Sequence, residues 1–335
     1  MPRLSIVVPY LGNLKFLEDT LVSVLANRPE ACQVVVVLNE AYDDPYELHK
    51  EISFVASRPD AGLLGGIFRG LRASEAPIVH VLACGMEVAP DWTDAALAHF
   101  DNPRVGAVAP MVLSAARPHR VVSAGLAYDR SGRVRRISEG CPVTQPAFDR
   151  RPCGPDARAA FYRRSALAAC IGSNEGRDVE LLGIDLALAL WYDGFHCVLE
   201  PECQVFAQPA LARRPGAFRT GVEEARLFWR WATHCGWWGS LAGHAAMLVG
   251  ECFTGLVWPP HAVRLAGHLT GGFSFNGPRR HNVPAAPAEV IQGPHFRRTA
   301  DWRQPDATTA SGDGSASNFS EACSSGPAAP RRAPG

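Results

Sequence analysis

Short apolar runs alternate with amphipathic helical patterns through the first 110 residues of the chain. The runs predict five buried strands, at residues 4–8, 33–38, 52–57, 78–82 and 105–108. A helix is predicted after Asn13, with apolar residues on one face at Leu14, Leu17, Leu21 and Leu25. Further helices are predicted to open at the glycines of residues 62–66 and to cover residues 92–100. This alternation predicts an α/β fold with an open, mostly parallel sheet and flanking helices.

The pattern is looser after Pro110. A strand is predicted over residues 121–128, and a turn at residues 129–132, where Asp, Ser and Gly favour turn geometry. A helix is expected to begin near Ser165, and another to cover residues 179–192 and to end before Gly194. A strand at residues 196–199 follows.

The C-terminal third differs in composition. Several aromatic and basic residues after Val222 precede an almost uncharged stretch at residues 236–250. This stretch is either a helical appendage packed on the main domain or a segment that lies in a membrane interface, a depth that suits Trp237 and Trp238. Gly, Ser, Ala and Pro dominate after Asn276, which predicts disorder. We therefore expect a main domain at residues 1–215, a helical appendage at 216–275 and a disordered tail at 276–335.

Composition narrows the class of protein. The chain has 335 residues, of which 47% are hydrophobic, and its 33 basic side chains balance 33 acidic ones. A core of good size is therefore expected, whereas the charge offers no reason to bind nucleic acid. No secretory signal and no apolar run long enough to span a bilayer are recognised, and the ten cysteines form no C-x-x-C pair. These features predict a cytoplasmic protein with reduced thiols, in which contact with a membrane surface is left open.

Four loops are predicted at the carboxyl ends of the parallel strands, where open sheets bind ligands. They contain Pro9 and Tyr10, then residues 39–44, residues 58–66 and residues 84–87. A polar loop can hold a base and ribose, and a glycine-rich loop lets the backbone approach phosphates. The chain contains neither the dinucleotide-binding G-x-G-x-x-G nor the P-loop pattern. The loops together favour a nucleotide site of another kind.

The order of these segments resembles the inverting family-two glycosyltransferases, which have the A-type nucleotide-sugar fold. The resemblance covers about residues 4–207 and is carried by the stretches LSIVVPYLGNLKFLEDTLVSVL, VVVVLNEAYDD, RPDAGLLGGIFRGLRAS, VLACGMEVAPDW, VVSAGLAYDRSG, AAFYRRSAL and IDLALALWYDGFHCVLEPECQVF. It implies a role in glycan biosynthesis, in which a sugar moves from a nucleotide-sugar donor to a hydroxyl acceptor with inversion. A glycan or a lipid-linked molecule would be the acceptor.

The sequence departs from the family pattern at most of the positions that carry chemistry. Leu38 stands where the family has an Asp that contacts the base. The metal-binding D-x-D motif corresponds to the run from Cys84 to Glu87, in which Glu87 is the one carboxylate. The Glu-Asp pair with the catalytic base falls on Leu182 and Gly183, and the late His falls on Ala207.

The resemblance still assigns candidate site residues. Around the nucleotide sugar they are Pro9, Tyr10, Asn39, Asp43 and Asp60. Glu87 would hold a divalent metal, Mn²⁺ or Mg²⁺, and Asp185, or failing it Glu180, would be the base.

Each assignment has a structural alternative. Glu87 is otherwise a solvated residue at a strand end, and the carboxylates of Asp43 and Asp44 otherwise shape a turn. Asp185 lies among apolar residues, so a buried, hydrogen-bonded role competes with the role of base. The arginines at residues 133–136 either bind diphosphate or are solvated charges of a hairpin.

Two other functions stay open at this stage. The fold can persist as a non-catalytic binding or scaffold module that has lost the metal and the base, because a fold alone does not secure an activity. The other is a metal-independent transferase in which arginine side chains take the place of the metal.

Overall fold

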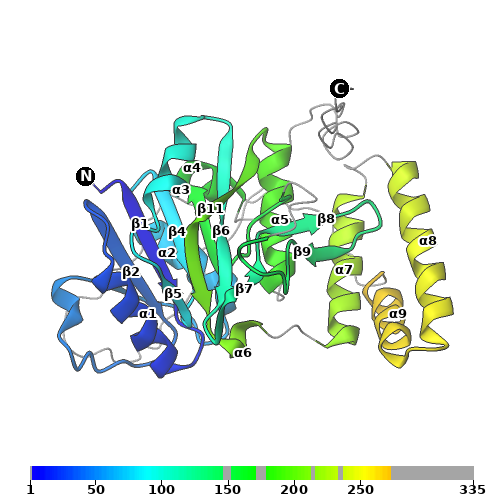
Figure 1. Ribbon diagram of the computed structural model, residues 1–335, viewed down its shortest axis with the longest axis horizontal. Helices are drawn as coiled ribbons and strands as arrows, with labels where there is room; N and C mark the ends of the chain where they lie inside the picture. Colours follow the sequence, from blue (N-terminus) through cyan, green and yellow to red (C-terminus); the bar gives the residue numbers. More distant parts are fainter. Residues whose placement is uncertain (1, 146–151, 171–178, 213–215, 233–236, 273–335) are drawn as a thin grey trace, which may run out of the picture.

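The computed structural model describes residues 2–145, 152–170, 179–212, 216–232 and 237–272. Within them, a nine-stranded sheet forms the centre, with the order β3-β2-β1-β4-β10-β6-β11-β5 and with β7 paired to β6 (Figure 1). The strands that run in one direction are β1 (Leu4–Pro9), β2 (Cys32–Leu38), β3 (Ser53–Ala56), β4 (Ile78–Leu82), β6 (Val105–Ser114) and β11 (His196–Ala207). The strands that run against their neighbours are β10 (Ala159–Arg163), β5 (Met86–Val88) and β7 (Arg117–Ser123).

Helices cover both faces of the sheet. Strand β1 shows why, because Ile6 and Val8 point into one apolar cluster and Val7 points into the other. The first cluster is covered by α1 (Leu14–Ala26), α3 (Asp94–Ala98) and the short 3-10 helix η2 (His99–Asp101). The second is covered by α2 (Gly62–Ala73), α4 (Arg164–Cys170) and α5 (Val179–Tyr192). The open, mostly parallel α/β sheet predicted from the sequence is confirmed.

Two local features fix the first helices on the sheet. The Asn13 side chain accepts a hydrogen bond from the Phe16 backbone N–H at 3.1 Å and so caps α1. Helix α2 approaches β1 through glycines, since a Cβ at Gly70 would lie 2.1 Å from Val7 Cγ1 and one at Gly66 would lie 2.7 Å from Pro9 Cβ. The glycine-rich segment therefore brings this helix close to the end of β1.

Some predicted elements differ in extent. Residues 121–128 do not form one strand but the end of β7 and then β8 (Leu126–Tyr128), because Gly125 interrupts them with φ +90°. Strand β8 pairs with β9 (Val134–Arg136) in a separate hairpin. The helix expected over residues 92–100 starts later, and Trp92 is instead buried ahead of it. Helix α5 covers the range predicted for it.

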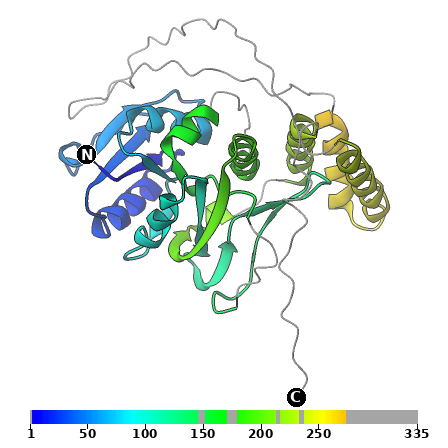
Figure 2. The same cartoon turned by 90° about the horizontal axis from the view of Figure 1, so that it is seen from above.

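Three helices follow the sheet, after the short α6 (Pro209–Ala212) and beyond α5 and the hairpin. They are α7 (Ala217–Trp231), α8 (Trp237–Gly255) and α9 (Pro259–Gly272), and both views show them side by side at one end of the molecule (Figures 1 and 2). Among the described residues, no helix combines the length and apolar character that crossing a bilayer requires. The domain boundaries stay a prediction, and the tail expected at residues 276–335 lies outside the described residues.

Candidate functional site

The order of strands reverses between β1 and β4, which places a topological switch point there. Three hydrogen bonds join the loops that leave the carboxyl ends of these strands. The Cys84 N–H donates to the Pro9 carbonyl at 3.3 Å, and the Leu11 N–H donates to Cys84 Sγ at 3.1 Å. The Tyr10 N–H donates to the Val37 carbonyl at 2.9 Å. The structure therefore brings the loops after β1 and β4 together with the end of β2.

Tyr10 directly follows β1 at this switch point. It is buried, and its hydroxyl donates to a carboxylate oxygen of Glu40 in the loop after β2. Burial, together with the hydrogen bond and charge of Glu40, raises the pKa of Tyr10 well above its usual range. The phenol therefore stays protonated and remains a donor. Sequence reasoning missed Glu40, although it directly follows the candidate Asn39.

The other candidates for the nucleotide sugar lie in the loops after β2 and β3. Asn39 is half-buried at the end of β2, and Asp43 is exposed four residues later. Asp60 is exposed, and its Oδ1 lies 3.2 Å from Arg58 Nε. The structure shows their positions but does not test their roles, which stay predictions.

Asp44, next to Asp43, has a structural role. Its carboxylate accepts hydrogen bonds from the backbone N–H groups of Leu48 at 2.7 Å and His49 at 3.0 Å. Burial raises the pKa of Asp44, but these bonds and the His49 ring outweigh it and lower the pKa overall. This residue shapes the turn before the 3-10 helix η1 (Leu48–Lys50).

The run from Cys84 to Glu87 is held between α1 and the end of β11. The Gly85 N–H donates to Thr20 Oγ1 at 2.9 Å, and the Gly85 carbonyl accepts from the Gln208 N–H at 3.0 Å. Glu87 lies on β5, and its Oε1 accepts a hydrogen bond from Gln208 Nε2 at 2.6 Å. Sequence reasoning missed Gln208. It directly follows Ala207, the position that corresponds to the late His of the family, and this adjacency could have indicated it.

These residues do not fit a divalent metal ion. Glu87 offers one carboxylate, and one of its two oxygens already accepts a hydrogen bond from the Gln208 amide. Hard cations prefer several oxygen ligands. Burial raises the pKa of the Cys84 thiol to about 11, so this side chain stays protonated. Within the described part of the chain, no group of three or more His, Cys, Asp or Glu residues is arranged to hold a metal.

A buried ion pair that sequence reasoning missed lies behind the end of β4. The Arg158 carbonyl accepts the Ala83 N–H at 2.7 Å, and the Arg158 Nε donates to Asp156 Oδ1 at 2.9 Å. The guanidinium also donates to the Leu211 carbonyl. Burial raises the pKa of Asp156, but the charge and hydrogen bonds of Arg158 outweigh it, and the net pKa is lowered. The pair thus ties the loop before β10 to β4 and α6.

Asp185 is placed away from these loops. It lies on α5, where its Oδ2 accepts from Arg230 Nη1 at 2.5 Å and its Oδ1 accepts from Trp231 Nε1 at 2.7 Å. Both partners belong to α7. Glu180 lies in the first turn of α5. The structure does not test the role of either acid as base.

The basic run of the hairpin does not consist of solvated charges alone. Arg136 is buried, and the Arg133 Nη2 donates to Glu251 Oε1 of α8 at 2.8 Å. Arg135 is exposed. Eight cysteines within the described residues form no disulfide.

Comparison with known proteins shows a family and a fold to which this chain is similar. Residues 5–135 match the family model described as glycosyl transferase family 2. The crystal structure of GalNAc-T7 with UDP, GalNAc and Mn²⁺ is similar, with a TM-score of 0.54 and 14% identity over 79% of this chain. A mannosyltransferase from Pyrobaculum calidifontis in complex with GDP-Man and Mn²⁺ has a TM-score of 0.48 and 15% identity over 82% of this chain and 88% of that one.

The chain spans about half of the GalNAc-T7 chain, 54% of its length. No curated protein matches the sequence. The resemblance to family-two glycosyltransferases is thereby confirmed over residues 5–135, and the fold of the chain is that of the A-type glycosyltransferases.

Proposed function

We propose that this protein transfers a sugar from a nucleotide-sugar donor to a hydroxyl group of an acceptor. The observation that carries the proposal is the set of contacts at the switch point, where Tyr10, Glu40 and Cys84 meet at the carboxyl ends of β1, β2 and β4. The matched family region contains all three residues. Ligands of open α/β sheets bind at such a point.

In this proposal the donor lies over the loops after β1, β2 and β3. Pro9 and Tyr10 form its floor, and the polar side chains of Asn39, Asp43 and Asp60 contact the nucleotide or the sugar. Tyr10 supports this role because its hydroxyl stays protonated and holds Glu40, so that the first two loops are ordered relative to each other.

The displacement is proposed to proceed with inversion, as the family resemblance implies. One carboxylate removes the proton of the acceptor hydroxyl while the bond between the sugar and the diphosphate breaks. The candidates are Asp185 and Glu180. The contacts of Asp185 with Arg230 and Trp231 engage both of its carboxylate oxygens, which counts against Asp185, because a base needs an accessible oxygen. The acceptor is proposed to be a glycan or a lipid-linked molecule.

The solved GalNAc-T7 structure contains Mn²⁺ together with UDP. In this chain Glu87 would supply at most one carboxylate ligand to such an ion. Removal of divalent ions with a chelator during nucleotide binding tests this assignment directly.

A second candidate function is the binding of a nucleotide sugar without transfer. It is supported by the engagement of two of the three acids that the family resemblance assigns to the chemistry, Asp185 in an ion pair and Glu87 with Gln208. A protein with this function would bind the donor and leave its glycosidic bond intact.

Thermal unfolding with a panel of nucleoside diphosphates and their sugars, with and without Mn²⁺, tests both functions. A ligand at 100 times its Kd stabilises the folded state by about 2.7 kcal/mol, which shifts the Tm measurably. Asp43→Asn should weaken this shift. Asp101→Asn is the matched control, because Asp101 is also exposed but lies before the amino end of β6.

The outcomes separate the candidates. A shift together with release of nucleoside diphosphate from one donor supports the transferase. A shift without turnover, for any acceptor, supports the binding module. Absence of a shift with every nucleotide contradicts both.

A further inference from the structure

The outward surface of α8, α9 and the turn between them carries no formal charge. At residues 238–270 every exposed side chain is uncharged, and among them only Thr254 and Thr270 carry a hydroxyl group. The largest apolar groups lie at the turn, where Leu256, Val257 and Trp258 are 82%, 84% and 62% exposed. Phe253 and Trp238 extend the same surface along α8 with exposures of 68% and 82%. Large exposed patches of this kind mark sites of interaction.

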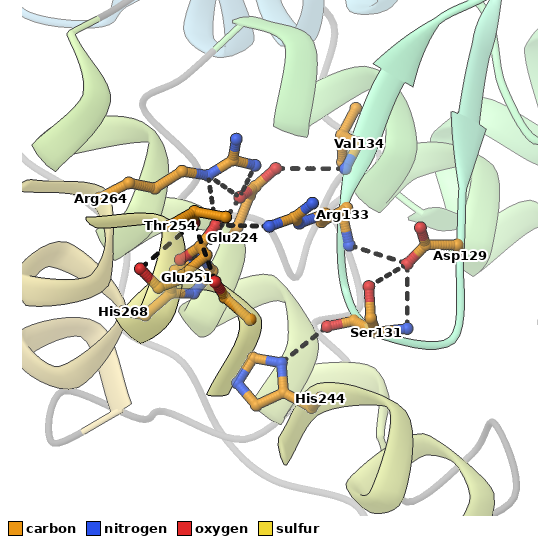
Figure 3. Close-up of polar contacts among 11 residues, drawn as sticks. Asp129, Ser131, Arg133, Val134, Glu224, His244, Glu251, Thr254, Arg264 and His268 are labelled. Carbon is orange, nitrogen blue, oxygen red and sulfur yellow. Dashed lines mark hydrogen bonds and ion pairs between the residues drawn. The ribbon is translucent and has the colours of Figure 1, made fainter. Parts of the chain in front are cut away.

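The charged side chains of α8 and α9 face the rest of the protein. Glu251 and Arg264 are the two Asp, Glu, Lys or Arg residues at positions 237–272, and Glu251 is fully buried. Figure 3 shows both of them turned toward the hairpin and α7. Arg264 Nε lies 3.1 Å from Glu224 Oε2 and 3.4 Å from Glu251 Oε1, and Arg133 of the hairpin donates to Glu251 at 2.8 Å.

Two histidines complete this inward-facing network. The His268 ring is buried with its Nε2 at 3.4 Å from Glu224 Oε2, and His244 Nδ1 donates to the Ser131 carbonyl in the hairpin turn at 2.6 Å (Figure 3). The side chains of His244, Glu251, Arg264 and His268 thus hold these helices on the rest of the protein. Their polarity is reversed relative to a surface helix in water, which turns its apolar face inward.

We propose that the surface formed by α8, α9 and their turn docks this protein on the interfacial region of a lipid bilayer. The absence of charge on this surface indicates which kind of partner it binds. A protein partner bound through a mixed rim needs polar or charged groups around the contact, whereas the hydrocarbon boundary of a membrane needs none. The exposed side chains of this surface are apolar apart from two hydroxyls and the thiol of Cys252.

The arrangement of aromatic groups supports the same occupant. Trp238 lies at the start of α8, and Trp258 lies after its end, so the two indole rings bracket a helix of 19 residues. Tryptophan prefers the boundary between headgroups and acyl chains. Since no described helix can cross a bilayer, the helices lie on the membrane rather than span it. The inference does not depend on the chemistry proposed for the switch point.

Flotation of the full chain with phosphatidylcholine vesicles tests the proposal. The protein should float with these neutral vesicles, and 0.5 M NaCl should not release it, because no charges take part. The double substitution Leu256→Ser, Val257→Ser should reduce the bound fraction by more than about tenfold. Val22→Ser is the matched control, since Val22 is 68% exposed on α1, and this variant should float like the unchanged protein.

Three results would overturn the proposal. The first is a protein that stays with the soluble fraction at every lipid concentration. The second is flotation with anionic vesicles alone that salt abolishes. The third is a dimer, seen by sedimentation velocity, that the double substitution dissociates while vesicles bind neither form. The nucleotide-induced shift in Tm should be the same for the double variant and the unchanged protein, which keeps this test separate from that of the proposed function.

Discussion

Asp185 on α5 and Arg230 on α7 form an ion pair in which Oδ2 lies 2.5 Å from Nη1. Trp231 donates to the other carboxylate oxygen at 2.7 Å, so both oxygens of a buried acid are engaged. Burial raises the pKa of Asp185, and the charge of Arg230 offsets part of that effect. The pair links the sheet-covering helix α5 to α7, the first of the three C-terminal helices.

We expect Asp185→Asn to lower the free energy of unfolding by about 2–4 kcal/mol, because the substitution leaves a largely buried guanidinium without its counter-charge. Urea denaturation at pH 7 measures the change. Asp193→Asn, at an exposed position near the end of the same helix, should stay within about 0.5 kcal/mol of the unchanged protein. If Asp185→Asn instead keeps full stability and donor affinity but loses transfer, Asp185 is the base.

Tyr10→Phe should weaken the binding of the preferred nucleoside diphosphate by about threefold to tenfold, because the variant loses a hydrogen bond to a charged group that orders Glu40. Isothermal titration calorimetry measures the affinity. Tyr46→Phe removes a hydroxyl from an exposed tyrosine and serves as the control. Equal affinities for the two variants would place the donor elsewhere on the protein.

The Asp156–Arg158 pair predicts a dependence of stability on pH. The folded protein holds the pKa of Asp156 below its unfolded value of about 3.9, so the stabilisation is complete above that pH and is lost as the pH falls through the folded pKa. Asp156→Asn should therefore cost about 3–5 kcal/mol at pH 7. Urea denaturation at a series of pH values should show the difference between the two proteins shrinking below about pH 4. A difference that grows in acid contradicts the assignment.

Gly70→Ala should destabilise the protein by about 1–3 kcal/mol, because the added methyl group overpacks the contact between α2 and β1. Gly250→Ala, also in a helix but with open space around the new Cβ, should instead be neutral or stabilising by up to about 1 kcal/mol. Thermal unfolding of the two variants checks the difference. If both behave alike, the close approach of α2 to Val7 is not a tight contact.

The sheet could be predicted because its central strands are buried on both faces. Such strands are mostly apolar, and β1, β2 and β4 are therefore visible as short apolar runs in which Ser5, Gln33 and His80 are the polar positions. Strand β5 escaped prediction, since three residues give no period and its pairing with β11 joins segments more than 110 positions apart, as Met86 and Ala207 show.

The roles of the polar residues were harder to predict, because their partners also lie far away in the sequence. Asp185 was recognised as an acid among apolar neighbours, but Arg230 lies 45 positions away. Arg133 was recognised as part of a basic run, and its partner Glu251 lies 118 positions away. The sequence shows that a charged residue among apolar ones needs a partner. Which residue is the partner depends on how the helices pack. The resemblance to a family predicted which loops form the site, and the role of each side chain in them stays a prediction.

The position of β10 in the sheet has a consequence for how the protein is made. The first four strands are complete by Leu82, but the open side of β4 is covered by Ala159–Arg163, which the ribosome adds much later. Until then the nascent chain exposes the unpaired backbone of a strand whose side chains are all apolar or aromatic, the kind of edge on which chains aggregate. Fragments that end before Ala159 should accordingly accumulate as inclusion bodies, and expression of the protein should benefit from chaperones that hold this half-finished sheet.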